Sequence, residues 1–97
     1  MRKLVTRPQA QLDVEDAAAW YERQKPGLGL SFLDELDYVL VRIASAPSQF
    51  PRIHPAIRRG LLKRFPYSVY FMASEEQVEI IAVLHQRRHP DTWRSRL

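Results

Sequence analysis

The spacing of apolar residues changes from a helical to a strand repeat near Pro47, and this change limits the chain to a mixed fold. Before it, apolar side chains recur every three or four residues, as at Ala10 and Val14. After it they alternate with their neighbours, as at Tyr67 and Val69. The first spacing predicts helix and the second predicts strand. Helices followed by a run of strands are typical of the α+β class.

Interruptions of the pattern set the boundaries of the predicted elements. Pro8 suits the first turn of a helix, Thr6 and Gln9 have the spacing of a capping box, and residues 25–29 are rich in turn formers. Pro47 ends the second helix. In chain order we predict an edge strand over 3–6, helices over 9–24 and 30–46, a loop over 47–55, strands over 57–65, 67–73 and 78–87, and a helical turn over 90–94.

These elements predict a single domain over residues 1–97 in which a helical hairpin covers one face of a three-stranded antiparallel meander. The last strand is apolar on both faces, which indicates a central position in the sheet. Simple alternation would put Ile80, Ala82 and Leu84 on one face, and Ile81, Val83 and His85 on the other. We expect Tyr70, His85 and the arginines to gather on the face that the helices leave open.

Charge points to an anionic partner. The 97-residue chain has a net charge of +4, with nine Lys/Arg against four Asp/Glu from Arg52 onward. Such a surface attracts nucleic acid or an acidic protein. The chain has no cysteine, its three histidines lack the spacing of metal ligands, and no apolar run is long enough for a membrane span or a signal peptide. We therefore expect a cytoplasmic protein without metal or cofactor.

Several phrases together resemble a known family. They read AAAWYERQKPGLGLSFLDEL, RRGLLKRFPYSVYF and IIAVLHQRRHPDTW. From roughly Leu4 to Arg94 the chain resembles the RelE/ParE superfamily of bacterial toxins from type II toxin–antitoxin systems, often called plasmid-stabilisation proteins. The LH-x-RR ending of the last strand resembles the ParE side. The resemblance implies a RelE/ParE-like fold and a growth-inhibiting toxin. It also implies neutralisation by a cognate antitoxin, whose C-terminal segment wraps over the toxin in a hetero-oligomer.

The superfamily contains two mechanisms, and both stay open at this point. RelE-like members cleave messenger RNA on the ribosome without a metal, whereas ParE-like members inhibit DNA gyrase by binding it. The RelE-like pattern is incomplete here, because Ser68 stands where those ribonucleases have Arg, and Trp93 and Arg94 replace a terminal Tyr or His. The candidates for a ribonuclease site are Arg59, Lys63, Tyr70, His85 and Arg87.

A binding mechanism needs a surface rather than a catalytic group. We predict a target-binding surface of Arg58, Arg59, Lys63, Arg64, His85, Arg87, Arg88 and Trp93. Alternative interpretations give some of these residues structural roles: Lys63 and Arg64 as solvated strand ends, His85 as a hydrogen-bonded strand residue, and Trp93 as a packing anchor. Trp20 and Tyr21 are predicted to be core or helix-packing residues. A third possibility is a small basic nucleic-acid-binding module, although no signature of such a module is present.

Overall fold

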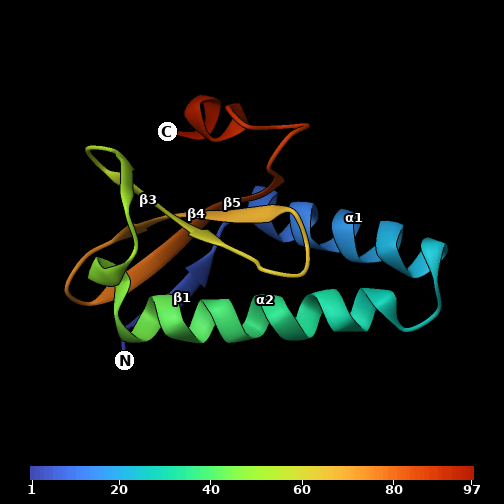
Figure 1. Ribbon diagram of the computed structural model, residues 1–97. Helices are drawn as coiled ribbons and strands as arrows, with labels where there is room; N and C mark the ends of the chain where they lie inside the picture. Colours follow the sequence, from blue (N-terminus) through green and yellow to red (C-terminus); the bar gives the residue numbers. More distant parts are fainter.

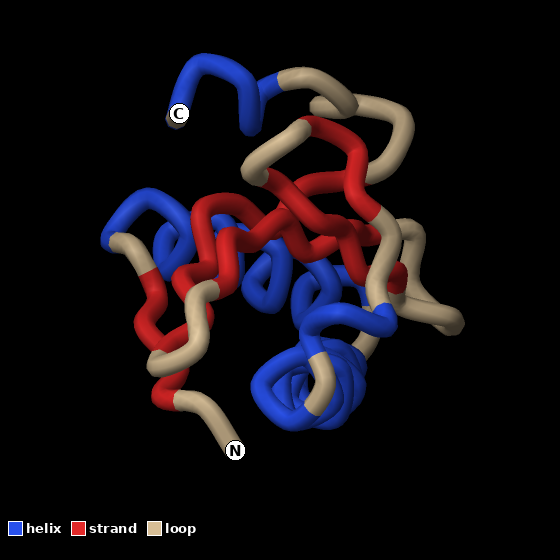
Figure 2. The backbone as a smooth tube through the Cα atoms, turned by 90° about the vertical axis from the view of Figure 1, so that its left-hand side faces the viewer, coloured by secondary structure: helices blue, strands red, loops and turns tan.

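The computed structural model describes residues 1–97 and places a β-sheet between two helices and the C-terminal segment (Figures 1 and 2). This arrangement confirms the predicted α+β class with a helical hairpin on one sheet face. In chain order the elements are β1 (Lys3–Thr6), α1 (Pro8–Gln24), α2 (Leu28–Ser45), the 3-10 turn η1 (Pro47–Gln49), β2 (Arg52–His54), β3 (Ile57–Leu61), β4 (Tyr67–Ala73), β5 (Gln77–His85) and the 3-10 turn η2 (Thr92–Arg96).

The sheet has five strands in the order β1-β5-β4-β3-β2. Strand β1 runs parallel to the first half of β5, with Lys3 opposite Gln77 and Thr6 opposite Ile80. The other neighbours are antiparallel. The prediction that the last strand is central is therefore confirmed, and the parallel edge strand closes one side of the sheet.

The predicted loop over 47–55 is wrong in part, because it contains β2, which pairs with β3. Three residues between prolines are too few to show an alternating pattern, so no strand was predicted there. The predicted strand 57–65 is also too long. Strand β3 ends at Leu61, and the Glu35 carboxylate of α2 then accepts hydrogen bonds from the backbone N–H groups of Lys63 and Arg64. This contact turns the chain away from the sheet before Phe65.

The N-terminus of α1 lacks the predicted capping box. Thr6 remains in β1, opposite Ile80, and the N-cap is Arg7, which makes no side-chain capping hydrogen bond. The Arg7 backbone N–H donates to the Ile80 carbonyl oxygen at 3.0 Å, so pairing with the sheet continues up to the first helical residue. Strand pairing thus overrides the local capping signal.

The hairpin turn between the helices is held by a side chain of α1. The Glu22 carboxylate accepts hydrogen bonds from the backbone N–H groups of Gly27 and Gly29, at 2.9 and 3.1 Å. These amides lie at the start of α2, where no helical carbonyl is available to them. A Cβ on Gly29 would lie 2.6 Å from the Ala18 carbonyl oxygen, so glycine is required for the two helices to approach this closely.

The main core lies between the helices and the sheet. Its centre is an aromatic group in which the Tyr21, Phe32, Phe65 and Tyr67 rings contact one another at 4.8 to 6.0 Å between centroids. The aliphatic stripes of both helices extend this core along β4 and β5. Neither helix has the length and apolar character that a membrane crossing requires.

A β-bulge in β5 interrupts the pairing with β4. Tyr70 lies opposite Ala82, but the next residue, Phe71, lies opposite Ile80. Ile81 is therefore an extra residue on the β5 side. An extra residue reverses the alternation of side chains beyond it.

The bulge makes the predicted faces of the last strand wrong. Val83 joins the helix-side core, whereas Ile81 and Leu84 lie on the opposite face with Tyr70. His85 packs against the Tyr67 ring at 5.4 Å, on the helix side. The expected gathering of Tyr70 and His85 on one open face is consequently wrong.

Candidate functional site

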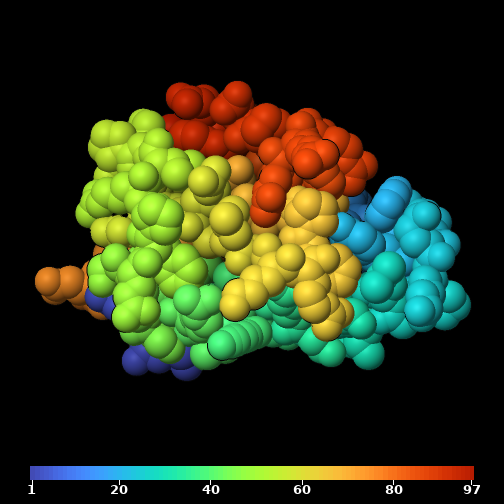
Figure 3. Space-filling view, viewed as in Figure 1, coloured from blue at the N-terminus to red at the C-terminus, as the bar shows by residue number.

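Residues 86–97 form the C-terminal strap, which covers the sheet face opposite the helices (Figure 3). Trp93 fixes the strap to this face, because its ring stacks on Tyr70 with centroids 5.8 Å apart and it is only 3% exposed. Its indole N–H donates to the Pro90 carbonyl oxygen at 3.0 Å. The interpretation of Trp93 as a packing anchor is thus confirmed.

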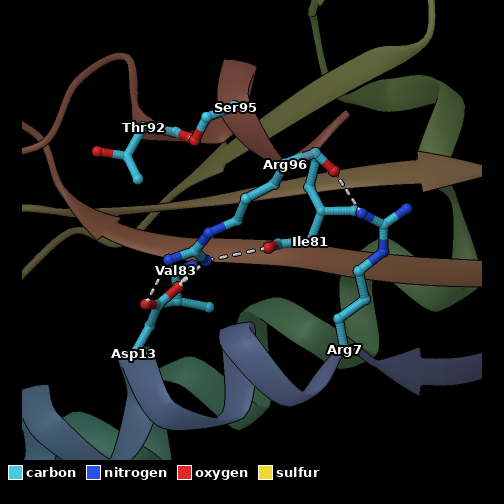
Figure 4. Close-up of polar contacts among 7 residues, drawn as sticks. All are labelled: Arg7, Asp13, Ile81, Val83, Thr92, Ser95 and Arg96. Carbon is cyan, nitrogen blue, oxygen red and sulfur yellow. Dashed lines mark hydrogen bonds and ion pairs between the residues drawn. The ribbon is translucent and has the colours of Figure 1, made fainter.

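A largely buried ion pair fixes the end of the strap to α1 (Figure 4). The Arg96 guanidinium donates to both carboxylate oxygens of Asp13, at 2.6 and 3.0 Å. Asp13 also accepts from the Val83 backbone N–H at 3.0 Å, and Arg96 donates to the Ile81 carbonyl oxygen at 3.2 Å. Because β1 pairs with β5 only as far as Ile80, the pair satisfies the polar groups of the uncovered edge of β5.

Arg7 adds a second attachment for the strap. Its Nη1 donates to the Arg96 carbonyl oxygen at 2.6 Å, and its Nε forms an ion pair with Glu79 of β5 at 2.8 Å. At the other end of Arg96, the hydrogen bond that its guanidinium donates to the Asp13 carboxylate raises the pKa of the guanidinium. Both the side chain and the main chain of Arg96 are therefore held by partners from the first half of the chain or from β5.

A cleft of about 330 Å³ lies between α1 and the beginning of the strap, and we call it the α1–strap cleft. The Arg88 guanidinium lies over the Trp20 ring, 5.6 Å from its centre, and Trp20 is 39% exposed. Stacked Trp–Arg pairs of this kind retain a flat surface on which a partner can pack. Other polar residues that line the cleft are Asp13, Asp16, Arg23, Tyr67, His85 and His89.

His85 is held in its neutral form at the base of this cleft. Its Nδ1 accepts hydrogen bonds from the backbone N–H groups of Arg87 and Arg88, at 3.1 and 3.3 Å. Burial lowers the pKa of His85, and the charges of Arg88, His89 and Arg87 lower it further. Because Nδ1 is an acceptor, the single ring proton is assigned to Nε2. His85 therefore organises the turn after β5.

Tyr67, which contacts His85, and its neighbour Tyr21 stay protonated. Burial raises the pKa of Tyr67, and the Arg88 guanidinium acts in the opposite direction. Burial also raises the pKa of Tyr21, and the neighbouring Tyr67 raises it further. The cleft thus offers the neutral phenol of Tyr67, a neutral imidazole and exposed guanidiniums, beside the carboxylates of Asp13 and Asp16. This chemistry suits stacking and hydrogen bonding to a partner.

The chain matches the family described as "ParE toxin of type II toxin-antitoxin system, parDE" over residues 4–90. It belongs to this ParE toxin family. The expected resemblance, including its ParE side, is confirmed, and the chain is the toxin component of a type II toxin–antitoxin system. No curated protein sequence matches the chain significantly.

A solved structure described as "Chromosomal ParDE TA system from P. aeruginosa" has the same fold as this ParE-family chain. The TM-score is 0.76 at 19% sequence identity, covering 88% of this chain and 96% of the other. The family match ends at residue 90, within the C-terminal strap. Trp93 and Arg96 therefore lie outside the matched segment, and their roles follow from their contacts alone.

The predicted site residues of this ParE-family toxin fall into separate places. His85 and Arg88 line the α1–strap cleft, and Arg87 is exposed next to them. Lys63 and Arg64 are exposed in the turn between β3 and β4. They are solvated residues after a strand end, and their backbone amides, as described above, hold the turn against α2.

The remaining predicted residues have structural contacts. Arg58 donates to the Phe50 carbonyl oxygen at 2.6 Å and so ties β3 to the segment after η1. Arg59 lies opposite Tyr70, and its Nε is buried without a hydrogen-bond partner. The side chain of Trp93 is buried between the strap and the sheet, so the place of Trp93 in a target-binding surface is wrong.

Sequence reasoning missed several residues of the site. Trp20 was predicted to be a core or helix-packing residue but lines the α1–strap cleft. Trp20 precedes Tyr21 in the sequence and does not belong to the apolar stripe of α1. This position could have indicated that the Trp20 side chain is exposed. Asp13 and Arg96 are 83 residues apart and gave no comparable signal. Their pairing depends on how the helix and the strap meet at the edge of β5.

Proposed function

We propose that this toxin inhibits DNA gyrase by binding it, in the cytoplasm of a bacterium, and that a cognate antitoxin neutralises it in a hetero-oligomer. Membership of the ParE family supports the binding mechanism, since inhibition of gyrase is what the ParE side of the superfamily implies. The observation that carries the proposal is the separation of the candidate catalytic residues on different faces of the sheet.

General acid–base catalysis needs its groups within hydrogen-bond reach of one substrate. Tyr70 is 2% exposed beneath the strap, on the face opposite the helices. His85 lies on the helix side, with Nδ1 already accepting from backbone amides. Lys63 is in the turn beyond β3. These positions do not support the ribonuclease alternative.

The rim of the α1–strap cleft is the surface that we propose for gyrase. It presents Trp20, Arg87 and Arg88, of which Trp20 and Arg88 already stack on each other. Tryptophan and arginine are the residue types that most often dominate binding energy at protein interfaces. The stacked pair needs little further ordering on binding, which reduces the entropic cost.

The test is DNA supercoiling by purified gyrase, run in parallel with cleavage of ribosome-bound messenger RNA. The wild-type toxin should inhibit supercoiling and leave messenger RNA intact. Trp20→Ala and Arg88→Gln should each weaken inhibition at least about tenfold, as expected for hot-spot residues. Lys25→Gln, which removes one charge at the helical turn, should have no effect. Messenger RNA cleavage with normal supercoiling would select the ribonuclease alternative.

For the antitoxin, we propose the outer face of α2 as one contact. Leu30, Tyr38 and Val41 are exposed there by 62%, 59% and 55%. Apolar side chains on a helix surface suit a partner segment that buries them. Co-purification with the product of the adjacent gene should fail or weaken for Tyr38→Ser/Val41→Ser and persist for Leu12→Ser on α1. Equal binding by both variants would move the antitoxin contact elsewhere.

A further inference from the structure

A second cleft, of about 270 Å³, lies at the end of the sheet away from the α1–strap cleft. It is lined by Arg2, Arg52 and Arg58, and we call it the three-arginine cleft. The N-terminal segment, the chain from η1 to β3 and the β4–β5 turn meet at this end, where the blue, yellow-green and orange atoms adjoin in Figure 3. Its one acidic lining residue is Glu75.

Backbone carbonyls orient all three guanidiniums. Arg2 Nε donates to the Ser74 oxygen at 2.8 Å, and Arg52 Nη1 donates to the Pro55 oxygen at 2.6 Å. Arg58 is held by the Phe50 oxygen, as described above. None of the three forms an ion pair, since the ion pairs of the molecule involve other arginines. Each guanidinium therefore keeps most of its N–H donors for a ligand.

The strand register brings two of these charges together. Arg52 of β2 lies directly opposite Arg58 of β3. Like charges directly opposite each other on neighbouring strands are destabilising. An anion between them removes the repulsion, so the free protein gains stability when an anion binds.

The lining of the cleft favours phosphate over a peptide. Peptide segments bind through buried apolar anchors or by adding a strand to a sheet edge. The cleft has no large apolar side chain in its lining, and three of its eight lining residues are arginines. The edge strand β2 has only three residues, an irregular register, and prolines on both sides, Pro51 and Pro55. These features block strand addition.

From this geometry we propose that the three-arginine cleft binds backbone phosphates of duplex DNA. Arginine recognises phosphate oxygens through paired N–H donors, and pre-oriented guanidiniums lose little freedom when they do so. The contact is independent of base sequence, because the cleft offers no element that enters a groove. The site is separate from the surface that we propose for gyrase, and it is tested without gyrase.

The experiment measures binding of a fluorescent DNA duplex to the full chain by anisotropy at several salt concentrations. The wild type should bind weakly, with a log–log salt slope of about −3 for three phosphate contacts. Arg2→Gln and Arg52→Gln should each weaken binding about tenfold and make the slope less steep by about one. Circular dichroism should show that both variants keep the wild-type fold.

The matched controls remove one charge each at the opposite end of the molecule. Lys25→Gln and Lys63→Gln should leave both affinity and salt slope within about twofold of the wild type. Equal losses in the cleft variants and the controls would overturn the proposal in favour of unspecific attraction by net charge. A polyglutamate peptide provides a second test. If it binds more tightly than DNA, and Arg52→Gln abolishes this binding, the ligand of the cleft is an acidic protein segment and the proposal is overturned.

Discussion

The Asp13–Arg96 pair should be one of the largest single contributors to the stability of this toxin. Its two side chains are 13% and 14% exposed, and the carboxylate also accepts from the Val83 backbone N–H. Replacing Asp13 by Asn keeps an oxygen for that amide but removes the charge that faces the guanidinium. Asp13→Ala removes both interactions, which leaves the edge N–H without a partner and the nearly buried cation with the Ile81 carbonyl oxygen alone.

The structure sets the expected size of the effect. Removing one partner of a buried ion pair costs about 3–5 kcal/mol. Residual exposure lets water reach the Arg96 guanidinium, so we expect the lower end, about 3 kcal/mol for Asp13→Ala and about 2 kcal/mol for Asp13→Asn. A domain of this size has about 5–15 kcal/mol of stability in total. The corresponding fall in melting temperature is about 10 °C or more.

Urea unfolding followed by circular dichroism measures these differences, provided that the slope with urea is unchanged. Asp16→Asn is the matched control, because Asp16 is exposed one turn further along α1 and makes no recorded ion pair. A double-mutant cycle with Arg96→Met should show a coupling energy above about 1 kcal/mol. The reasoning is refuted if Asp13→Asn and Asp16→Asn lower the free energy of unfolding by amounts that agree within about 0.5 kcal/mol.

Three other substitutions test separate features of the fold. Gly29→Ala should destabilise the protein by about 1–3 kcal/mol despite the better helix propensity of Ala, because the new Cβ would clash with the Ala18 carbonyl oxygen; urea unfolding measures this. Trp93→Ala should cost about 3 kcal/mol and change the near-ultraviolet circular dichroism, since it removes the ring that stacks on Tyr70. Folding lowers the pKa of His85, so the unfolded chain binds the proton first as pH falls. Stability is therefore full above about pH 6.5 and decreases as pH falls from there to the folded pKa. The histidine NMR signal should titrate below that value, and His85→Asn should reduce the pH dependence.

Each of these has a clear contrary result. Ser31→Ala, two residues after Gly29, is the control for the helix substitution, and a comparable loss there would remove the argument from close approach. A Trp93→Ala variant that loses less than about 1 kcal/mol would mean that the strap is not fixed by this ring. A His85 signal that titrates above its ordinary range would mean that the ring is not held neutral.

Elements with long, regular patterns were predictable from the sequence. The two helices, the strand Tyr67–Ala73 and the central position of β5 all follow from periodicity and from apolar character on both faces. Periodicity works here because each of these elements buries one or both faces against a continuous core. Strand β2 was not predicted, because its pairing is specified by β3 rather than by its own three residues.

The bulge at Ile81 explains why the candidate site was only partly predictable. The alternating pattern assigns side chains to the correct sheet face only as far as an inserted residue. No residue type near Ile81 indicates that a residue is inserted there. One unpredicted residue was enough to move His85 to the helix side, away from Tyr70. The ribonuclease hypothesis depended on that pair, so the local backbone, rather than the choice of residues, removes its main support.

The arginines of this toxin divide into those that hold the fold and those that remain available for a partner. Arg7 and Arg96 are committed to buried or half-buried partners, whereas Arg88 and the three-arginine cleft lie at opposite ends of the molecule. A single antitoxin segment that covers the α1–strap cleft would leave the second cleft open. If the two proposed surfaces are distinct, the neutralised complex should therefore lose inhibition of gyrase and still bind DNA with the salt dependence of the free toxin. Loss of both properties on antitoxin binding would instead require a partner that spans the whole length of the sheet.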